Sequence, residues 1–179
     1  PAQIPGMIVM TLADDDGSVD RLRQRIVVLF NATDDPQLFA APSLAAYNFD
    51  LHEVQQASSD PVVVTSTWDG DTSTFAVPAR TTAVFVSLRA AEDQIDLVIE
   101  DIAELVADGV LNSGQGNALT VKLENALAKI ARGQTRAAIN QLNAFINQVE
   151  GFVAGGILTP EQGAALIAAV QDIIDTLLA

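Results

Sequence analysis

The second half of the chain repeats its apolar residues at the spacing of an α-helix. Isoleucine, leucine, valine or phenylalanine recurs every three or four residues in four separate stretches, which predicts four amphipathic helices. The stretches cover about 95–106, 119–130, 136–153 and 160–177. Glycines follow the first three, as is common at helix ends. Asn112 and Thr159 are placed to cap the second and fourth helices, with Gln115 and Gln162 three residues later.

The helical half also repeats itself. Residues 109–119 align with residues 156–166 at an offset of 47, with six of the eleven positions identical. The two copies, about 92–133 and 139–179, each predict an αα-hairpin, and two such hairpins predict a four-helix bundle. Gly116 and its counterpart Gly163 lie in the first turn of a helix, where glycine costs about 0.5–1 kcal/mol relative to alanine. We therefore expect another backbone to approach closely at both positions.

The first half has a different pattern, made of short runs of β-branched and aromatic residues between turn signals. Six runs predict strands, at residues 7–12, 26–30, 49–54, 61–65, 74–77 and 82–86. Residues 68–74 are typical of a hairpin connection, because Asp69-Gly70 readily adopts the positive φ of a tight turn. The chain is thus predicted to be an antiparallel β-sandwich over 1–88 followed by an all-α bundle of two duplicated hairpins over 89–179.

Composition supports this division and limits the partners. Tyr47, Trp68, five of seven phenylalanines and six of seven prolines precede residue 89. The net charge of −14 would repel nucleic acid and anionic lipids, and no apolar run reaches the roughly 20 residues that cross a bilayer. The absence of cysteine excludes disulfides and thiolate chemistry. We expect a soluble chain without an export signal of its own, with neither nucleic-acid binding nor membrane insertion.

An acidic run is the candidate for a metal site. Asp14, Asp15 and Asp16 stand together and Asp20 follows, and calcium prefers several hard oxygen ligands in a flexible loop. The run lacks the alternating acidic spacing and the distal glutamate of an EF-hand, so a solvated acidic turn is the favoured interpretation and calcium the alternative. No other cofactor is predicted. Asp71, beside the hairpin turn, is explained by that turn.

The residues do not assemble a catalytic site. His52 is the only histidine, and its place in a strand pattern favours a structural role. Acidic residues are so abundant that a carboxylate pair carries no information. Trp68 and Tyr47 are candidates for stacking on sugar rings, with core packing as the alternative. Asn31 starts an N-glycosylation pattern but ends an apolar run, which favours a strand-to-turn corner.

Five ordered segments of the first half carry a family resemblance. They are residues 4–10, 26–33, 51–54, 59–63 and 75–86. Together they resemble the C-terminal β-domain of pullulanase-type α-1,6-glucosidases. In that family the domain follows a catalytic barrel that cleaves α-1,6 branch links with an aspartate nucleophile and a glutamate acid. None of that barrel is in this chain, so the resemblance implies no catalytic residue here. It also implies that further strands precede Ile4.

The helical half resembles a second family. Residues 114–119, 122–123, 138–142 and 144–149 are similar to the FIMAH type of appended domain, over roughly 92–178. Both resemblances imply a non-catalytic accessory region of a secreted bacterial enzyme that debranches starch or pullulan. The sandwich would pack on the catalytic barrel and the bundle would act as a docking or spacing unit. α-Glucan or a cell-surface component is a further expected partner, and the alternative is a stand-alone module that binds carbohydrate or a cell surface.

Overall fold

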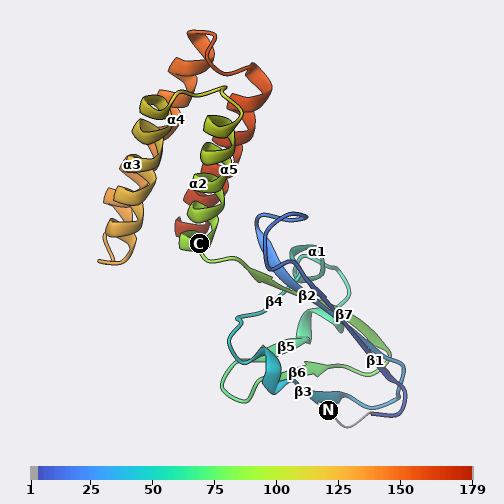
Figure 1. Cartoon of the computed structure of the whole chain (residues 1–179). Coiled ribbons are helices and arrows are strands. Elements are labelled where there is room, and N and C mark those ends of the chain that lie inside the picture. Colours follow the sequence, from blue (N-terminus) through green and yellow to red (C-terminus); the bar gives the residue numbers. More distant parts are fainter. Residues whose placement is uncertain (1–3, 179) are drawn as a thin grey trace. The chain divides into compact units, whose positions relative to one another are not determined.

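Two compact units follow each other along the chain, with the boundary between Leu88 and Arg89. The computed structural model describes residues 4–178. Figure 1 shows strands in the first unit and long helices in the second. The predicted fold class, antiparallel sheets followed by a helical module, is confirmed. In the described part of the chain, no helix is both long enough and apolar enough to cross a membrane.

The first unit contains two antiparallel sheets. One has the strand order β1-β2-β7-β4 and the other β3-β6-β5. The strands of the first are β1 (Met7–Ala13), β2 (Arg23–Asn31), β4 (Asp50–Leu51) and β7 (Thr81–Leu88). Those of the second are β3 (Gln37–Ala40), β5 (Thr67–Asp69) and β6 (Thr74–Val77). Three short helical turns connect strands along the sequence: η1 (Pro42–Leu44) lies between β3 and β4, and α1 (Glu53–Gln56) and η2 (Val63–Thr65) lie between β4 and β5.

Alternate residues of the long strands build the core between the sheets. Val27 and Leu29 of β2 lie opposite Phe85 and Ala83 of β7, and all four side chains are fully buried. Phe75 of β6 packs onto Phe85 from the other sheet, with ring centroids 4.9 Å apart. Because side chains alternate along a strand, the residues between these positions point to the opposite face of the sheet.

Two of the predicted strands are wrong in whole or in part. Residues 49–54 form only the two-residue β4 before α1 begins, and the run 61–65 ends in η2 (Val63–Thr65) and contains no strand. Polar side chains bond to the local backbone in both places: His52 accepts from the N–H of Val54 (3.3 Å) and Asp60 from that of Val62 (2.8 Å). Such bonds favour turns over strand pairing. The four-residue β3, which was not predicted, pairs with β6.

The predicted hairpin at residues 68–74 forms, with Trp68 of β5 opposite Phe75 of β6. Its positive φ lies at Ser73 (51°) and not at Gly70, which corrects the expectation for the Asp-Gly pair. The Asp69 carboxylate closes the turn by accepting from the Thr72 hydroxyl (2.8 Å) and from nearby backbone N–H groups. The hydrogen bond from Thr72 is the main cause that lowers the pKa of Asp69.

A glutamine side chain continues the sheet beyond β4. His52 donates its N–H to the carbonyl of Val84 (2.8 Å), which extends the short pairing of β4 with β7. Next, the Gln55 Nε2 donates to the carbonyl of Thr82 (2.9 Å), and its Oε1 accepts from the N–H of Val84 (2.7 Å). The Gln55 amide therefore makes the two bonds to β7 that a peptide group of a neighbouring strand would make.

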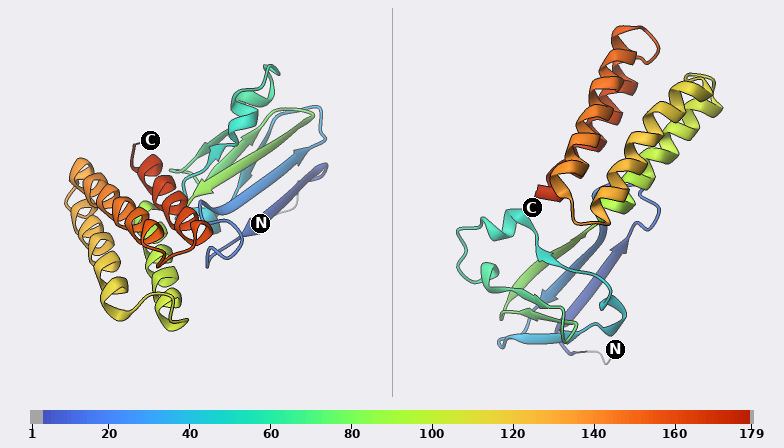
Figure 2. Two further views of the ribbon diagram at one scale, coloured as in Figure 1. Left: turned by 90° about the horizontal axis from the view of Figure 1, so that it is seen from above. Right: turned by 90° about the vertical axis from the view of Figure 1, so that its left-hand side faces the viewer.

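The second unit is a bundle of four helices, which Figure 2 shows as long rods. They are α2 (Ala91–Ala107), α3 (Ser113–Ile130), α4 (Thr135–Ala154) and α5 (Pro160–Leu178). Each helix packs against its neighbours in the sequence, and α2 also packs against α5. The core positions of α2 and α4 correspond at the offset of 47: Ile95, Val98 and Ile102 in α2, and Leu142, Phe145 and Val149 in α4.

The sequence repeat is reproduced in the helix caps. Asn112 accepts from the N–H of Gln115, whose side chain accepts from the N–H of Asn112, a reciprocal capping box at 2.9 and 2.8 Å. Thr159 and Gln162, 47 residues later, make the same pair of bonds at 3.2 and 2.9 Å. The residues expected to cap α3 and α5 do so.

Gly116 and Gly163 also have equivalent surroundings, but not the ones that were expected. An ideal Cβ at Gly116 would lie 2.4 Å from the Cγ2 of Val106, and one at Gly163 would lie 2.2 Å from the Cγ2 of Val153. Both valines are side chains of the preceding helix in the same hairpin. The expected close approach of another backbone is therefore wrong, because a valine side chain fills the space. Each hairpin is locked at its corner by a glycine–valine contact.

Candidate functional site

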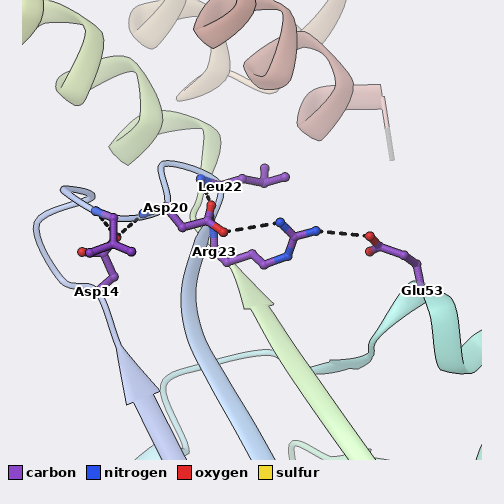
Figure 3. Close-up of polar contacts among 6 residues, drawn as sticks. Asp14, Asp20, Leu22, Arg23 and Glu53 are labelled. Carbon is purple, nitrogen blue, oxygen red and sulfur yellow. Dashed lines mark hydrogen bonds and ion pairs between the residues drawn. The ribbon is translucent and has the colours of Figure 1, made fainter.

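The acidic run predicted as a metal site is a loop ordered by its own backbone. Asp14 accepts from the N–H groups of Val19 (3.1 Å) and Asp20 (2.7 Å). Asp20 accepts from the N–H groups of Leu22 and Arg23, both at 2.9 Å. Figure 3 shows the Asp14 and Asp20 carboxylates turned to these separate groups. The carboxylates therefore hold the turn between β1 and β2.

Arg23 links this loop to α1. Its guanidinium lies 3.4 Å from the Asp20 carboxylate and 3.2 Å from that of Glu53, as Figure 3 shows. Partial burial raises the pKa of Asp20, but the hydrogen bonds from the N–H groups of Arg23 and Leu22 and the Arg23 guanidinium outweigh it, so the pKa is lowered overall. The pKa of Asp16 is also lowered, chiefly by the hydrogen bond from the Ser18 side chain.

Asp15 is directed elsewhere, toward Arg25 of β2. The Arg25 guanidinium pairs with the Asp15 carboxylate and donates to the Tyr47 hydroxyl (2.9 Å). Within residues 4–178, no three histidine, aspartate or glutamate side chains form a group that could hold a metal ion. Calcium at Asp14, Asp15, Asp16 and Asp20 stays a prediction, for which isothermal titration with calcium chloride is the direct test.

The two candidate sugar-stacking residues lie at the edge of an aromatic cluster. Trp68 packs on Phe75 with ring centroids 4.3 Å apart and meets the edge of Phe49 at 5.2 Å. Tyr47 lies 6.2 Å from Phe49, and the Arg25 guanidinium is 4.8 Å from its ring centroid. Both side chains are half-buried, and the Trp68 Nε1 is buried without a hydrogen-bond partner. Sugar contact through these rings stays a prediction.

Asn31 has the structural role that was predicted. Its side chain is buried, and its Nδ2 donates to the carbonyls of Asp35 (2.9 Å) and Pro78 (2.8 Å). Its Oδ1 accepts from the N–H and hydroxyl of Thr33. Asn31 is thus a strand-to-turn corner in which the amide is fully used. His52 likewise acts on the backbone, as the cap of α1.

An exposed apolar surface, which no chemical motif in the sequence marks, lies on the first sheet. We call it the outer face: positions 8, 10 and 12 of β1 and 26, 28 and 30 of β2, which are opposite one another in the register. All six residues are apolar, and four are well exposed: Ile8 by 67%, Met10 by 45%, Leu12 by 50% and Phe30 by 39%. The unbroken apolar run from Met7 to Met10 could have indicated this surface, because a strand that is covered on both faces has apolar residues at successive positions.

An apolar groove lies along the other side of β1. This edge groove has a volume of about 1110 Å³. Its lining comes from β1 and the segment before it, and from β3 and η1: Ile4, Met7, Ile8, Val9, Thr11 and residues 38–44. None of these residues is charged, and only Thr11 and Ser43 have polar side chains. β1 therefore exposes apolar surface on both of its faces.

Comparison with known proteins gives each unit a separate match. The family described as alpha-1,6-glucosidases, pullulanase-type, C-terminal, matches residues 1–88, and the FIMAH domain matches residues 95–175. Pullulanase 1, chloroplastic, from Arabidopsis thaliana is 39% identical over 95 residues, which are 50% of this chain and 10% of the plant protein.

Solved structures of PulA are also similar to part of the chain. Ligand-free PulA from Klebsiella pneumoniae aligns with a TM-score of 0.43 at 26% identity, over 49% of this chain and 8% of that one. PulA from Klebsiella oxytoca aligns with a TM-score of 0.40 at 24% identity, over 47% and 8%. The chain thus spans about a tenth or less of the length of these relatives.

The family matches confirm both resemblances seen in the sequence. They place no catalytic domain in the chain, which corresponds only to the C-terminal part of such enzymes. Residues 1–88 belong to the C-terminal domains of pullulanase-type α-1,6-glucosidases, and a FIMAH domain follows them at residues 95–175.

Proposed function

We propose that the chain is the non-catalytic C-terminal accessory region of a secreted bacterial enzyme that hydrolyses α-1,6 links in starch or pullulan. The family match of the first unit supports this proposal, as does the small share of each relative that the chain covers. The single histidine caps a helix turn and the acidic loop is held by backbone amides, so neither of these two candidates is arranged as a hydrolytic site. Catalysis would belong to a domain outside this chain.

The outer face is the observation that carries the proposal, because exposed apolar side chains gain free energy when another protein surface covers them. The exposed fractions of Ile8, Met10, Leu12 and Phe30 amount to about two whole side chains. Covering them is worth about 3–6 kcal/mol, at roughly 1.5–3 kcal/mol for each fully buried apolar side chain. A contiguous apolar patch of this kind marks an interaction surface. The catalytic part of the same enzyme is the proposed partner.

A lysine at Met10 tests this attachment. In the full-length enzyme, Met10→Lys would place a charge in the interface, and we expect the half-life of pullulan hydrolysis at elevated temperature to fall at least several-fold. Val19→Lys, at a loop residue that is 88% exposed, is the matched control and should leave the half-life unchanged. In the isolated 179-residue chain both variants should unfold at the parent temperature. Equal half-lives for the two variants in the full-length enzyme would contradict attachment through the outer face.

For the FIMAH domain we propose a docking or spacing role without a part in catalysis. Its acidic residues crowd on α2, whose first turn carries Glu92 and Asp93, and its helices are closed around their own core. Ending the full-length enzyme after Leu88 should therefore leave kcat on soluble pullulan unchanged. A large fall in kcat, with the enzyme still folded, would contradict this role.

A further inference from the structure

Positive charge gathers at the start of α4, in a chain that is otherwise strongly acidic. Residues 125–149 are the longest stretch of the sequence without aspartate or glutamate, and they contain Lys129, Arg132 and Arg136. Within residues 4–178, no acidic side chain forms an ion pair with these three cations. They stay unpaired although the chain has 23 acidic residues and a net charge of −14.

The cations continue into a stripe of amides along α4. Asn140, Asn143 and Asn147 follow Arg136 at spacings of three and four residues, and all four residues are exposed. The core residues of α4 have the same periodicity but face the inside of the bundle. Glu150 ends the stripe with a negative charge. We call this surface, from Arg136 to Glu150, the amide face. An amide can both donate and accept hydrogen bonds, and it costs less to remove from water than a carboxylate.

The duplication provides an internal comparison for this face. At the offset of 47, the positions of the three asparagines and of Gly151 are acidic in α2: Asp93, Asp96, Glu100 and Glu104. These four residues, the acidic face, are exposed, and no basic side chain that the structure describes forms an ion pair with them. Like charges at such spacings destabilise a helix. Because both hairpins have the same caps and core positions, folding requires neither the amides nor the acids.

We propose that the amide face of α4 docks on the acidic face of α2 in a second copy of the chain. The two helices run in the same direction, so that Arg136 of one copy lies beside Asp93 and Asp96 of the other. In this direction Glu150 meets Ala103, whereas the reverse direction would bring it to the acids at the start of α2. This inference rests on the docking role proposed for the FIMAH domain and names its partner.

Charge complementarity selects this occupant. The two faces have the same length and spacing because they occupy equivalent positions of the duplicated hairpin, so each amide or cation of one face can meet a carboxylate of the other. A neutral glycan would gain nothing from the cations. The net charge of −14 on each copy opposes association, but salt at about 0.15 M screens charges more than about 8 Å apart and leaves the contacts at the faces in place.

The contact joins copies head to tail. α2 and α4 each pack against both α3 and α5, so they lie at opposite corners of the bundle and their outward faces point away from each other. Each added copy therefore leaves one amide face and one acidic face open. A helix of 20 residues is about 30 Å long, and two such faces bury roughly 600 Å², which is typical of weak contacts. We expect a dissociation constant of order 10⁻⁴ M.

Sedimentation equilibrium of the 179-residue chain, from about 10 µM to about 1 mM, tests the association. Asn143→Asp places a carboxylate on the amide face and should weaken association at least tenfold. The variant should fold normally, because α2 has Asp96 at the equivalent position. Asn117→Asp, at an exposed asparagine of α3, changes the net charge equally and should leave association unchanged. Salt at about 1 M should abolish the association of the parent chain.

A charge exchange tests the pairing itself. Arg136→Glu and Asp96→Arg should each associate at least tenfold more weakly than the parent chain, because each brings like charges together. In an equimolar mixture, α4 of the Arg136→Glu chain fits α2 of the Asp96→Arg chain, and α4 of the latter fits the unaltered α2 of the former. The mixture should therefore recover the association of the parent chain.

Three results would overturn the proposal. The first is a parent chain that is monomeric at about 1 mM. The second is association that Asn143→Asp and Asn117→Asp change equally, or that persists at about 1 M salt, since it would use another surface such as the outer face. The third is a mixture that does not recover. A monomeric chain together with an unchanged kcat after truncation at Leu88 would refute the second copy and leave the docking role standing, whereas a fall in kcat would refute that role.

Discussion

Gly163→Ala is a sharp test of the glycine–valine contact in the second hairpin. Helix propensity predicts that the change stabilises the bundle, whereas the contact with Val153 predicts that it destabilises the bundle. In a helix, replacing glycine by alanine normally stabilises by about 0.5–1 kcal/mol. At Gly163 the new Cβ would lie 2.2 Å from the Cγ2 of Val153. Valine has one strongly preferred rotamer in a helix, so it cannot turn aside cheaply. Overpacking costs about 1–3 kcal/mol, and we expect a net loss of about 1–2 kcal/mol.

Gly151→Ala is the matched control, since Gly151 lies in α4 and has nothing within 4 Å of its ideal Cβ. It should gain the usual 0.5–1 kcal/mol or so. The two variants should therefore differ by about 2 kcal/mol, which is about 8–16 °C in the melting temperature of a unit of this size. Circular dichroism at a helical wavelength follows the bundle, whereas fluorescence of Trp68, the only tryptophan, follows the first unit and should not change.

Val153→Ala combined with Gly163→Ala completes the cycle. Removing the valine methyls costs about 1 kcal/mol alone but relieves the clash, so the double variant should be more stable than the sum of the single changes by about 1–2 kcal/mol. The reasoning would be refuted if Gly163→Ala stabilised the bundle as Gly151→Ala does, or if the two changes were simply additive.

Three further predictions concern the caps, the acidic loop and the aromatic cluster. Asn112→Ala should destabilise the bundle by about 1 kcal/mol in urea unfolding, while Ser113→Ala, one residue inside α3, changes little; equal effects would contradict the capping box. Because the pKa of Asp20 is lowered in the folded state, its contribution is present above its ordinary value of 3.8 and is lost as pH falls through the folded pKa. Asp20→Asn should thus flatten the acid limb of the stability profile followed by Trp68 fluorescence, and an unchanged limb would count against the loop bonds. Trp68→Ala should lower the calorimetric melting temperature, at a cost of about 2–4 kcal/mol, without changing migration in a pullulan gel; lost retardation would instead show sugar contact.

The sequence was a good guide to structure wherever the determining interactions were local. The helices have regular apolar periodicity and their caps lie within four residues, so Asn112 and Thr159 could be assigned in advance. Because the hairpin sequence occurs twice, its helix boundaries could be predicted from two copies that agree with each other. β1 and β2 were predictable for the same reason, because each contains a long β-branched run.

Elements that depend on distant partners were missed. The four residues of β3 have no pattern of their own and form a strand because β6 pairs with them. The run that ends in η2 is rich in valine, yet Asp60 bonds to the backbone of Val62 and turns the chain. At Gly116 the sequence indicated shortage of space but could not show that the neighbour was the Val106 side chain.

The candidate sites divide in the same way. The clustering of Asp14, Asp15, Asp16 and Asp20 was visible, but not that their oxygens bond to the N–H groups of residues 18–20, 22 and 23 and to Arg25. The outer face and the edge groove have no chemical motif. Both can be recognised only in the three-dimensional structure, where both faces of β1 are seen to expose apolar side chains.

The Gln55 amide also limits how this protein can aggregate. Open sheet edges invite further chains, and a sheet open on both sides can grow without end. On the β7 side, the glutamine already occupies the Thr82 and Val84 bonding positions. Beyond these positions the sheet ends in the two-residue β4, so β1 is its long free edge and the place where a second molecule would pair most extensively.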